Sequence, residues 1–395
     1  MIRPTVATVD LGAIQANVRA LSEAGLASGP GDHAGPDPDR RGRAPAARRP
    51  DVIAVVKANA YGHGAARVGR ALEAAGVAML ACADIEEGVA LREAGVSIRI
   101  LVFGALSVSD LAGVFEHRLT PTVSTPAAAR ALERAAAGRG VQLGCHLKID
   151  TGMNRLGFRH DNLQRTMPEV LGSQHLRMEA VYTHFATADL PESPMMDEQR
   201  ARFEQATAAL GALGFTGARR HAANSAAMLR DARVWYDAVR PGLLIYGIVP
   251  PPLAASHLDL RPALSLSSRI VAVKGVRAGE GTSYGLRWRA GDPRDLAIIP
   301  AGYADGLDTR LGGRGHVLIR GRRVAVVGAV CMDMMMADVT GLDVSPGDEV
   351  VIIGRQGAEE ITAREVAGAI GSIPWEVVCR LGARIERRYA EPARS

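Results

Sequence analysis

Between residues 50 and 250 the sequence alternates short apolar segments with longer segments of helical character. Most of the short segments are continuous apolar runs of strand length, which is typical of strands covered on both faces of a parallel sheet. They lie at residues 53–58, 78–83, 98–103, 119–123, 143–149, 178–185, 219–223 and 242–248. Ala-, Leu-, Glu- and Arg-rich stretches of helical period separate them. Eight such units in about 200 residues predict an α/β fold with a closed parallel (β/α)8 TIM-type barrel, and a doubly wound open sheet is the alternative.

The pattern changes after three consecutive prolines at residues 250–252. Beyond them, short β-rich segments such as SSRIVAVKGV (267–276) and GDEVVIIG (347–354) are separated by Gly and Asp turns. We therefore expect residues 251–395 to form a smaller, mainly antiparallel β-domain, and residues 10–250 to form the barrel. The strand-like residues 1–9 have no place in the barrel, so they are expected to pair into the β-domain.

Two segments near the N-terminus have a distinct character. Residues 10–24 carry apolar side chains at helical spacing and predict a first helix, with Asp10 as its N-cap and Gly25 at its end. Residues 28–50 are rich in Gly, Pro, Arg and Asp and have almost no apolar side chains. Such a composition cannot offset the entropy of ordering, so this segment is predicted to be a disordered surface insertion.

The overall composition excludes several classes of protein. Apolar residues make up 47% of the 395 residues, which is enough for a sizeable core. The net charge of +5 comes without a helix-sized basic stripe, so no nucleic-acid partner is expected. No signal-peptide core or membrane-spanning stretch is present, and the four cysteines are far apart without the close Cys/His pairs of a metal site. These features predict a soluble, cytoplasmic protein with reduced thiols, no membrane partner and no metal.

Lysine usage is the most unusual feature of the composition. Of the 47 basic residues only Lys57, Lys148 and Lys274 are lysines, and all the others are arginines. Arginine cannot act as a neutral amine, an imine-forming nucleophile or a carbamate, so each lysine is a candidate for such chemistry. Lys57 interrupts an apolar strand at the end where a barrel gathers its reactive groups. Burial there favours the neutral amine that an imine-forming nucleophile requires.

The segment around Lys57 and seven further segments resemble the conserved blocks of one enzyme family. In chain order these segments are VVKANAYGHG (55–64), HLKIDTGMNRLGF (146–158), YTHFATAD (182–189), AANSAA (222–227), VRPGLLIYG (239–247), SYG (283–285), GYADG (302–306) and CMD (331–333). This sequence is similar to the alanine racemases, which are fold-type III pyridoxal-phosphate enzymes. The blocks span nearly the whole chain and occur in the family's order. The resemblance implies a pyridoxal 5'-phosphate-dependent isomerase that interconverts L-alanine and D-alanine.

The resemblance implies two catalytic bases. Lys57 would hold pyridoxal phosphate and exchange the substrate's proton on the face that gives the D enantiomer. Tyr284, supplied by the other subunit of a head-to-tail homodimer, would act on the L face. Racemisation needs proton donors on opposite sides of a flat carbanion, so the pair is chemically sufficient. A phenol is a weak base unless its surroundings lower its pKa.

The resemblance also implies the residues that surround the cofactor. Arg240 would donate to the pyridine nitrogen, which keeps that nitrogen unprotonated and favours a clean proton exchange. His184 would stack on the ring and link Arg240 towards Tyr284. The remaining cofactor-binding residues would be the phosphate ligands Tyr61, Ser225, Gly242 and Leu243, with Asn224 beside them.

A further group would bind the substrate. In the family the lysine at position 148 is often carbamylated, and the resulting anion would orient Arg155 against the cofactor. Arg155 and the backbone amide of Met332 would bind the substrate carboxylate. Asp333 would fix the Met332 loop, and Tyr303 would line the entrance.

The sequence departs from the family pattern near the substrate entrance. Trp375 stands where the family usually has a tyrosine that bonds the phosphate. Ala329 replaces a usual arginine, and Met334 stands where glutamine is common. These departures leave serine, or another small amino acid, open as the preferred substrate.

Two other functions are alternatives from different classes. A fold-type III decarboxylase of basic amino acids would protonate through a cysteine, and the tyrosine at position 284 argues against it. A non-enzymatic pyridoxal-phosphate carrier would need only the barrel, which would leave the β-domain unexplained.

Overall fold

Eight parallel strands close into a barrel in the computed structural model, which describes residues 4–27, 49–106 and 110–391. Each strand pairs with the next in the order given below, and the last pairs back onto the first. The strands are β2 (Asp51–Val55), β3 (Met79–Cys82), β4 (Arg99–Val102), β5 (Thr120–Val123), β6 (Leu143–Asp150), β8 (Leu176–Tyr182), β9 (Arg219–Asn224) and β10 (Ala238–Arg240). The predicted (β/α)8 barrel is therefore confirmed.

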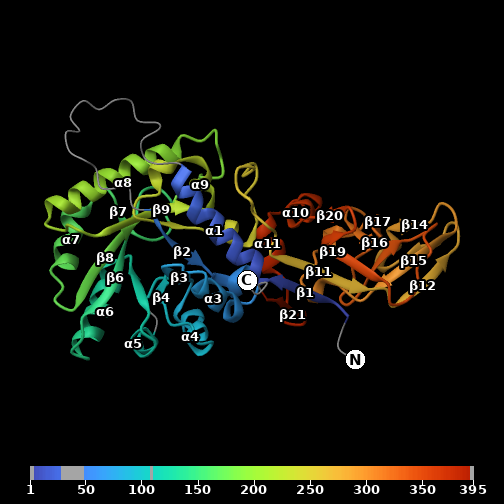
Figure 1. Ribbon diagram of the computed structural model, residues 1–395, viewed down its shortest axis with the longest axis horizontal. Coiled ribbons are helices and arrows are strands. Elements are labelled where there is room, and N and C mark those ends of the chain that lie inside the picture. The colour runs from blue at the N-terminus through green and yellow to red at the C-terminus, as the bar shows by residue number, and fades with distance from the viewer. Residues whose placement is uncertain (1–3, 28–48, 107–109, 392–395) are drawn as a thin grey trace.

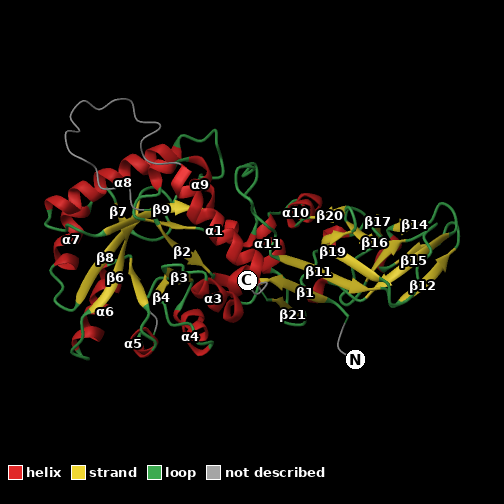
Figure 2. Cartoon of the chain, in the orientation of Figure 1, coloured by secondary structure: helices red, strands yellow, loops and turns green. Residues whose placement is uncertain are grey.

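Helices surround the barrel strands, as Figure 2 shows. They are α1 (Leu11–Ala27), α3 (Ala65–Ala74), α4 (Ile85–Glu93), α5 (Ala112–Glu116), α6 (Pro126–Ala137), α7 (Leu163–Leu171), α8 (Met195–Ala212) and α9 (Ser225–Arg230). Local sequence signals start several of them. Asp84 accepts a hydrogen bond from the Glu87 amide at the start of α4, and Thr125 accepts one from the Ala128 amide ahead of Pro126 at the start of α6.

The C-terminal part of the chain is built around a ten-stranded sheet and lies at the other end of the long molecule (Figure 1). Its strands are β1 (Val6–Asp10), β11 (Leu264–Arg269), β12 (Ala272–Val276), β15 (Arg294–Ile299), β16 (His316–Ile319), β17 (Arg322–Val327), β18 (Met335–Asp338), β19 (Glu349–Gln356), β20 (Glu359–Ile361) and β21 (Glu386–Ala390). All pairings in this sheet are antiparallel except that of β1 with β21. A small hairpin of β13 (Gly281–Thr282) and β14 (Trp288–Arg289) accompanies it.

The N-terminal strand β1 belongs to this sheet and not to the barrel. It lies between β11 and β21 and leads directly into α1, whose first turn is held by a 2.8 Å hydrogen bond from the Ala13 amide to Asp10. Two further helices, α10 (Ala363–Ile370) and α11 (Pro374–Cys379), lie where the sheet meets the barrel (Figure 1). The chain therefore crosses between its two parts twice, at β1–α1 and at residues 250–263, and α11 lies against the barrel without a crossing.

Three details differ from the sequence expectations or lie beyond the structure. The eighth strand is Ala238–Arg240, and the predicted strand at 242–248 is wrong, because Leu243–Tyr246, of which the last three residues are buried, form a 3-10 turn after Pro241. Helix α1 continues past Gly25 to Ala27, since one glycine costs a helix only about 1 kcal/mol. The insertion expected at 28–50 lies, apart from its last two residues, outside the described residues. No helix among the described residues is long and apolar enough to cross a membrane.

Candidate active site

A cavity of about 630 Å³ opens at the mouth of the barrel, where the parallel strands end. In (β/α)8 barrels this end carries the reactive groups. Eleven of the residues singled out from the sequence line it: Lys57, Tyr61, Lys148, Arg155, His184, Asn224, Ser225, Arg240, Gly242, Leu243 and Trp375. All come from the barrel except Trp375, which lies on α11. The barrel therefore brings together residues that are more than 180 positions apart in the sequence.

Lys57 follows β2 at the start of an unusual turn, α2 (Lys57–Tyr61). The next four residues have φ angles between 51° and 54°, in the left-handed region that L-amino acids seldom adopt. Glu87 stabilises the turn, because its carboxylate accepts hydrogen bonds from the Ala58 amide at 2.6 Å and the Ala83 amide at 2.8 Å. Burial, and then the nearby Arg155 guanidinium, lower the pKa of Lys57. Both effects favour the neutral, nucleophilic amine.

Lys148 at the end of β6 is a second amine with altered acidity. Burial lowers its pKa to about 8, and the cations Arg155 and Arg240 act in the same direction. Its Nζ lies 5.6 Å from the centroid of the Tyr182 ring. A substantial fraction of this amine is therefore neutral near physiological pH, which is the state that reacts with carbon dioxide.

Arg240 is buried and held by both terminal nitrogens of its guanidinium. Nη1 donates to His221 Nδ1 at 2.9 Å and to the His221 carbonyl at 2.8 Å. Nη2 donates to the carbonyls of Thr183 at 2.7 Å and Ala222 at 2.9 Å. Burial lowers the pKa of Arg240 to about 10, so it is still a cation at neutral pH. Within the described residues the hydrogen bonds of Arg240 are made by Nη1 and Nη2, and the fifth N–H, on Nε, has no protein acceptor.

Two histidines extend this network away from the cavity. Because Arg240 donates to His221 Nδ1, the neutral His221 ring carries its proton on Nε2 and donates it to His146 Nδ1 at 3.0 Å. Burial lowers the pKa of His221 well below its usual value and that of His146 to about 3. Both rings stay neutral, so the network fixes the orientation of Arg240 without adding charge.

His184 lies beside Arg240 on the wall of the cavity. Its Nδ1 is 3.3 Å from Arg240 Nη2, and burial lowers the pKa of His184 well below the usual value. The buried side chain of Gln199 on α8 fixes the backbone from His184 to Ala186. It donates to the His184 carbonyl at 2.9 Å and accepts from the Ala186 amide at 2.8 Å. A neutral imidazole is therefore presented to the cavity in one orientation.

One wall of the cavity is shaped to receive an anion. The Gly242 amide donates to Ser225 Oγ at 3.0 Å, so a hydroxyl and backbone N–H groups meet at the same point. A Cβ atom at position 242 would lie 2.7 Å from the Tyr61 hydroxyl oxygen, so a larger residue there would force the Tyr61 side chain to shift. Asn224 uses its side-chain oxygen to cap α9 through the Ala227 amide. Oriented amides with hydroxyl donors are a common phosphate site.

Charge in the cavity is strongly unbalanced. Four basic side chains line it, namely those of Lys57, Lys148, Arg155 and Arg240, and Asp189 is the one acidic side chain among the described lining residues. Like charges at this density repel one another unless an anion is bound. The cavity is therefore built for a ligand with several negative charges.

Four other predicted residues form a second cluster in the β-domain and do not line this cavity: Tyr284, Tyr303, Met332 and Asp333. Hydrogen bonds join their loops, from Ser283 Oγ to the Ala329 carbonyl at 2.8 Å and from the Tyr303 amide to the Cys331 carbonyl at 3.0 Å. Tyr284 is 78% exposed. Arg384 holds the Asp333 carboxylate at 2.7 Å.

Sequence reasoning missed three residues that shape the cavity. Glu87 and Gln199 act through backbone hydrogen bonds, and neither lies in a segment that resembles a known block. Cys379 lines the cavity near Lys57, but burial raises the pKa of its thiol to about 11, so it stays protonated. Glu87 follows the helix-capping Asp84 by three residues, a spacing that indicates the start of a helix. That spacing does not indicate that the Glu87 carboxylate contacts the turn after Lys57.

Comparisons with known proteins agree with this geometry. Residues 40–250 match the family described as alanine racemase, N-terminal domain, and residues 263–389 match alanine racemase, C-terminal domain. An alanine racemase of Symbiobacterium thermophilum is 42% identical over 389 residues, covering 98% of this chain and 97% of that protein. An alanine racemase of Halothermothrix orenii is 38% identical over 98% of this chain and 97% of its own.

Solved structures show the same architecture. The crystal structure of alanine racemase from D-cycloserine-producing Streptomyces lavendulae has a TM-score of 0.89 and 34% identity, with 99% of this chain and 98% of that chain covered. An alanine racemase from Bartonella henselae, described with covalently bound pyridoxal phosphate, has a TM-score of 0.83 and 25% identity, with 98% and 99% covered. The cavity at the barrel mouth, the β-domain beyond it and these matches over nearly the full length lead to one conclusion: the chain is a member of the alanine racemase family.

Proposed function

We propose that the protein interconverts L-alanine and D-alanine with pyridoxal phosphate held in the barrel cavity. The observation that carries this proposal is that a partly buried Lys57 with a lowered pKa shares a cavity with an anion-binding wall and three further basic side chains. The barrel, residues 10–250, would hold the cofactor. The β-domain, residues 251–395 with strand 1–9, would supply the second base.

The cavity residues fit pyridoxal phosphate in charge and in shape. Ser225, the amides of Gly242 and Leu243, and the Tyr61 hydroxyl would hold the phosphate, with Asn224 beside them. Arg240 Nε–H would donate to the ring nitrogen, and His184, which lines the cavity beside Arg240, would pack on the ring. Lys57 would hold the aldehyde carbon covalently, as its reactive amine permits. When bound, the cofactor supplies an electron-withdrawing ring that stabilises negative charge on the substrate α-carbon.

The reaction itself requires two proton-transfer groups. Lys57 Nζ would remove or return the α-proton on the D face, and the Tyr284 oxygen would do so on the L face. Removal on one face and return on the other inverts the carbon, and a single base could only return the proton to the face it came from.

Because Tyr284 is exposed and does not line the cavity of its own chain, we assign it to the cavity of a second copy. Its neighbours on this side of the β-domain include further exposed large side chains, among them Leu286, Tyr303, Met332 and Met334. Exposed apolar residues gathered in this way are typical of an interaction surface. A head-to-tail homodimer would place each β-domain over the other barrel and complete two identical sites.

The same arrangement would bind the substrate carboxylate. Arg155 is exposed at the cavity wall and would contribute its guanidinium, while the Met332 backbone amide of the second copy would contribute an N–H. Asp333, held by Arg384, would fix the Met332 loop, and Tyr303 would narrow the entrance.

All four cysteines are unpaired thiols, which supports a reducing compartment such as the cytoplasm.

Lys148 is proposed to carry a carbamate that turns Arg155 towards the cofactor. The pKa of about 8 leaves part of the amine neutral, and the surrounding cations would stabilise the resulting anion. Holoenzyme equilibrated with 13C-labelled bicarbonate should show a carbamate carbon signal by NMR that weakens as the pH falls below 8, since protonated amine cannot react. The signal should be absent in Lys148→Arg. Persistence of the signal in that variant would place the carbamate elsewhere.

Trp375 should weaken retention of the cofactor. An indole is larger than a phenol and donates only through its ring N–H, so it re-aims or loses one charge-assisted bond to the phosphate. Such a bond contributes about 1.5–3 kcal/mol, so Trp375→Tyr should bind pyridoxal phosphate at least about tenfold more tightly. Equilibrium titration of apoprotein measures this. Unchanged or weaker affinity in Trp375→Tyr would mean that position 375 does not contact the phosphate.

Circular dichroism tests the proposed activity and substrate together. Pure holoenzyme incubated with L-alanine should bring the optical signal to zero, as equal amounts of the two enantiomers form. L-serine should lose its signal more slowly, because Trp375 keeps the pocket small. A steady L-alanine signal would refute alanine racemisation, and faster loss with L-serine would reassign the substrate.

A further inference from the structure

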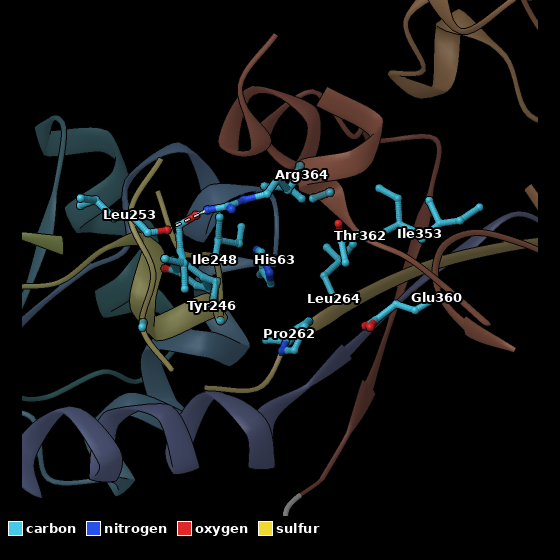
Figure 3. A pocket seen from close by; sticks show the side chains of 18 of the residues that line it. His63, Tyr246, Ile248, Leu253, Pro262, Leu264, Ile353, Glu360, Thr362 and Arg364 are labelled. Atoms are coloured by element: carbon cyan, nitrogen blue, oxygen red, sulfur yellow. Dashed lines mark hydrogen bonds between the residues drawn. The ribbon is translucent and has the colours of Figure 1, made fainter. Parts of the chain in front are cut away.

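A second cavity, of about 360 Å³, lies where the barrel meets the β-domain (Figure 3). Tyr246 and Ile248 form its barrel side, Leu253 lies on the connecting segment, and Leu264, Ile353 and Thr362 form its β-domain side. It shares no lining residue with the proposed active-site cavity. Helix α11 stands between them, with Val378 on this cavity and Trp375 and Cys379 on the other. The volume is within the range of cavities that bind small molecules.

His63 is the polar group at the centre of this cavity (Figure 3). The residue is fully buried, and its ring lies against Tyr246 with centroids 4.4 Å apart. Nδ1 is 2.9 Å from the Tyr61 carbonyl, which can only accept a hydrogen bond, so the ring proton is on Nδ1. Burial lowers the pKa of His63 to about 4, so the ring is neutral and Nε2 carries a lone pair. Among the described residues, no donor reaches Nε2.

The other polar side chains at the cavity already have partners. Arg364 donates to the carbonyls of Val249 at 3.0 Å and Leu253 at 3.2 Å, and so ties α10 to the loop after the barrel. Thr362 accepts from the Glu365 amide at 3.1 Å, and Glu360 accepts from Arg355 at 2.9 Å. A buried acceptor without a donor is costly, and His63 is one of the residues that line this cavity. Among the side chains that line the cavity in the described part of the chain, His63 therefore stands out as the one whose buried acceptor lacks a hydrogen-bond donor.

We propose that this cavity is a binding site for a small, neutral, mainly apolar molecule that carries a single hydroxyl or N–H donor. The apolar walls bind the body of the molecule, and His63 Nε2 accepts its one hydrogen bond. The neutral imidazole disfavours anions, which bring no donor, and the apolar walls disfavour cations, which would lose their hydration.

Indole and benzothiophene test the proposal because they share the same fused-ring shape, and only indole has an N–H donor. Isothermal titration of pyridoxal-phosphate-loaded enzyme should show indole binding about tenfold more tightly than benzothiophene, the effect of one hydrogen bond. His63→Phe keeps a ring but loses the acceptor, so indole should weaken about tenfold while benzothiophene changes little. His316→Phe, at an exposed histidine of β16, is the matched control and should leave both unchanged.

A second variant and a crystal structure test the proposal independently, in case His63→Phe does not fold. Ala255→Phe fills the cavity from the loop side and should weaken both probes. A crystal structure with indole should place the ring nitrogen within hydrogen-bond distance of His63 Nε2. Equal affinity for the two probes, unaltered indole binding in His63→Phe, or a crystal in which only water contacts Nε2 would each overturn the proposal.

Discussion

Replacing Lys57 with alanine should abolish racemisation, with a loss of about 10⁴-fold or more, because both the covalent attachment of the cofactor and one proton-transfer group disappear. Borohydride reduction of the wild-type holoenzyme, followed by denaturation and peptide mass analysis, should find pyridoxyl label on Lys57. The variant should retain no covalent label.

Lys274 provides the matched control for this experiment. It lies exposed on β12, so Lys274→Ala should retain both label and activity. Covalent label remaining in Lys57→Ala, or label on Lys148 in the wild type, would show that the assignment of Lys57 is wrong.

Removing the phenol oxygen of Tyr284 should stop proton transfer on the L face of the substrate and leave proton transfer on the D face. In Tyr284→Phe, racemisation should fall by about 10²–10⁴-fold, the usual contribution of one acid–base group. In deuterated water, D-alanine should still exchange its α-hydrogen without inversion, because Lys57 acts on that face. L-alanine should exchange far more slowly. NMR of the two enantiomers measures both rates.

Tyr236→Phe, a tyrosine on the barrel away from both clusters, controls for the loss of a hydroxyl and should behave as wild type. Equal loss of exchange for L- and D-alanine in Tyr284→Phe, together with loss of cofactor binding, would show that Tyr284 has a structural role instead.

The alternation of apolar strands and helical segments was enough to predict the barrel, because strands covered on both faces leave a strong signal. The false strand at 242–248 shows the limit of that signal. Leu244, Ile245 and Tyr246 are buried without pairing into the sheet, and a buried turn has the same apolar composition as a strand.

Site residues were predictable where side-chain chemistry is distinctive, as with three lysines among 47 basic residues. Residues that act through the backbone were not. Glu87 fixes the left-handed turn after Lys57, and Gln199 holds the loop of His184, and these contacts join segments that only the folded barrel brings together. His63 was part of a resembling segment, but its unmatched Nε2 depends on packing between the two parts of the chain.

Mixing two inactive variants tests most directly the central claim that each active site is shared between two copies. A dimer of one Lys57→Ala and one Tyr284→Phe subunit has one site with both wild-type groups and one with neither. After random subunit exchange of equal amounts, half the dimers are mixed, so activity should rise to about a quarter of the wild-type value. Recovery of that size would support the shared site. No recovery, once mass spectrometry has verified the mixed dimers, would contradict it and place both bases within one chain.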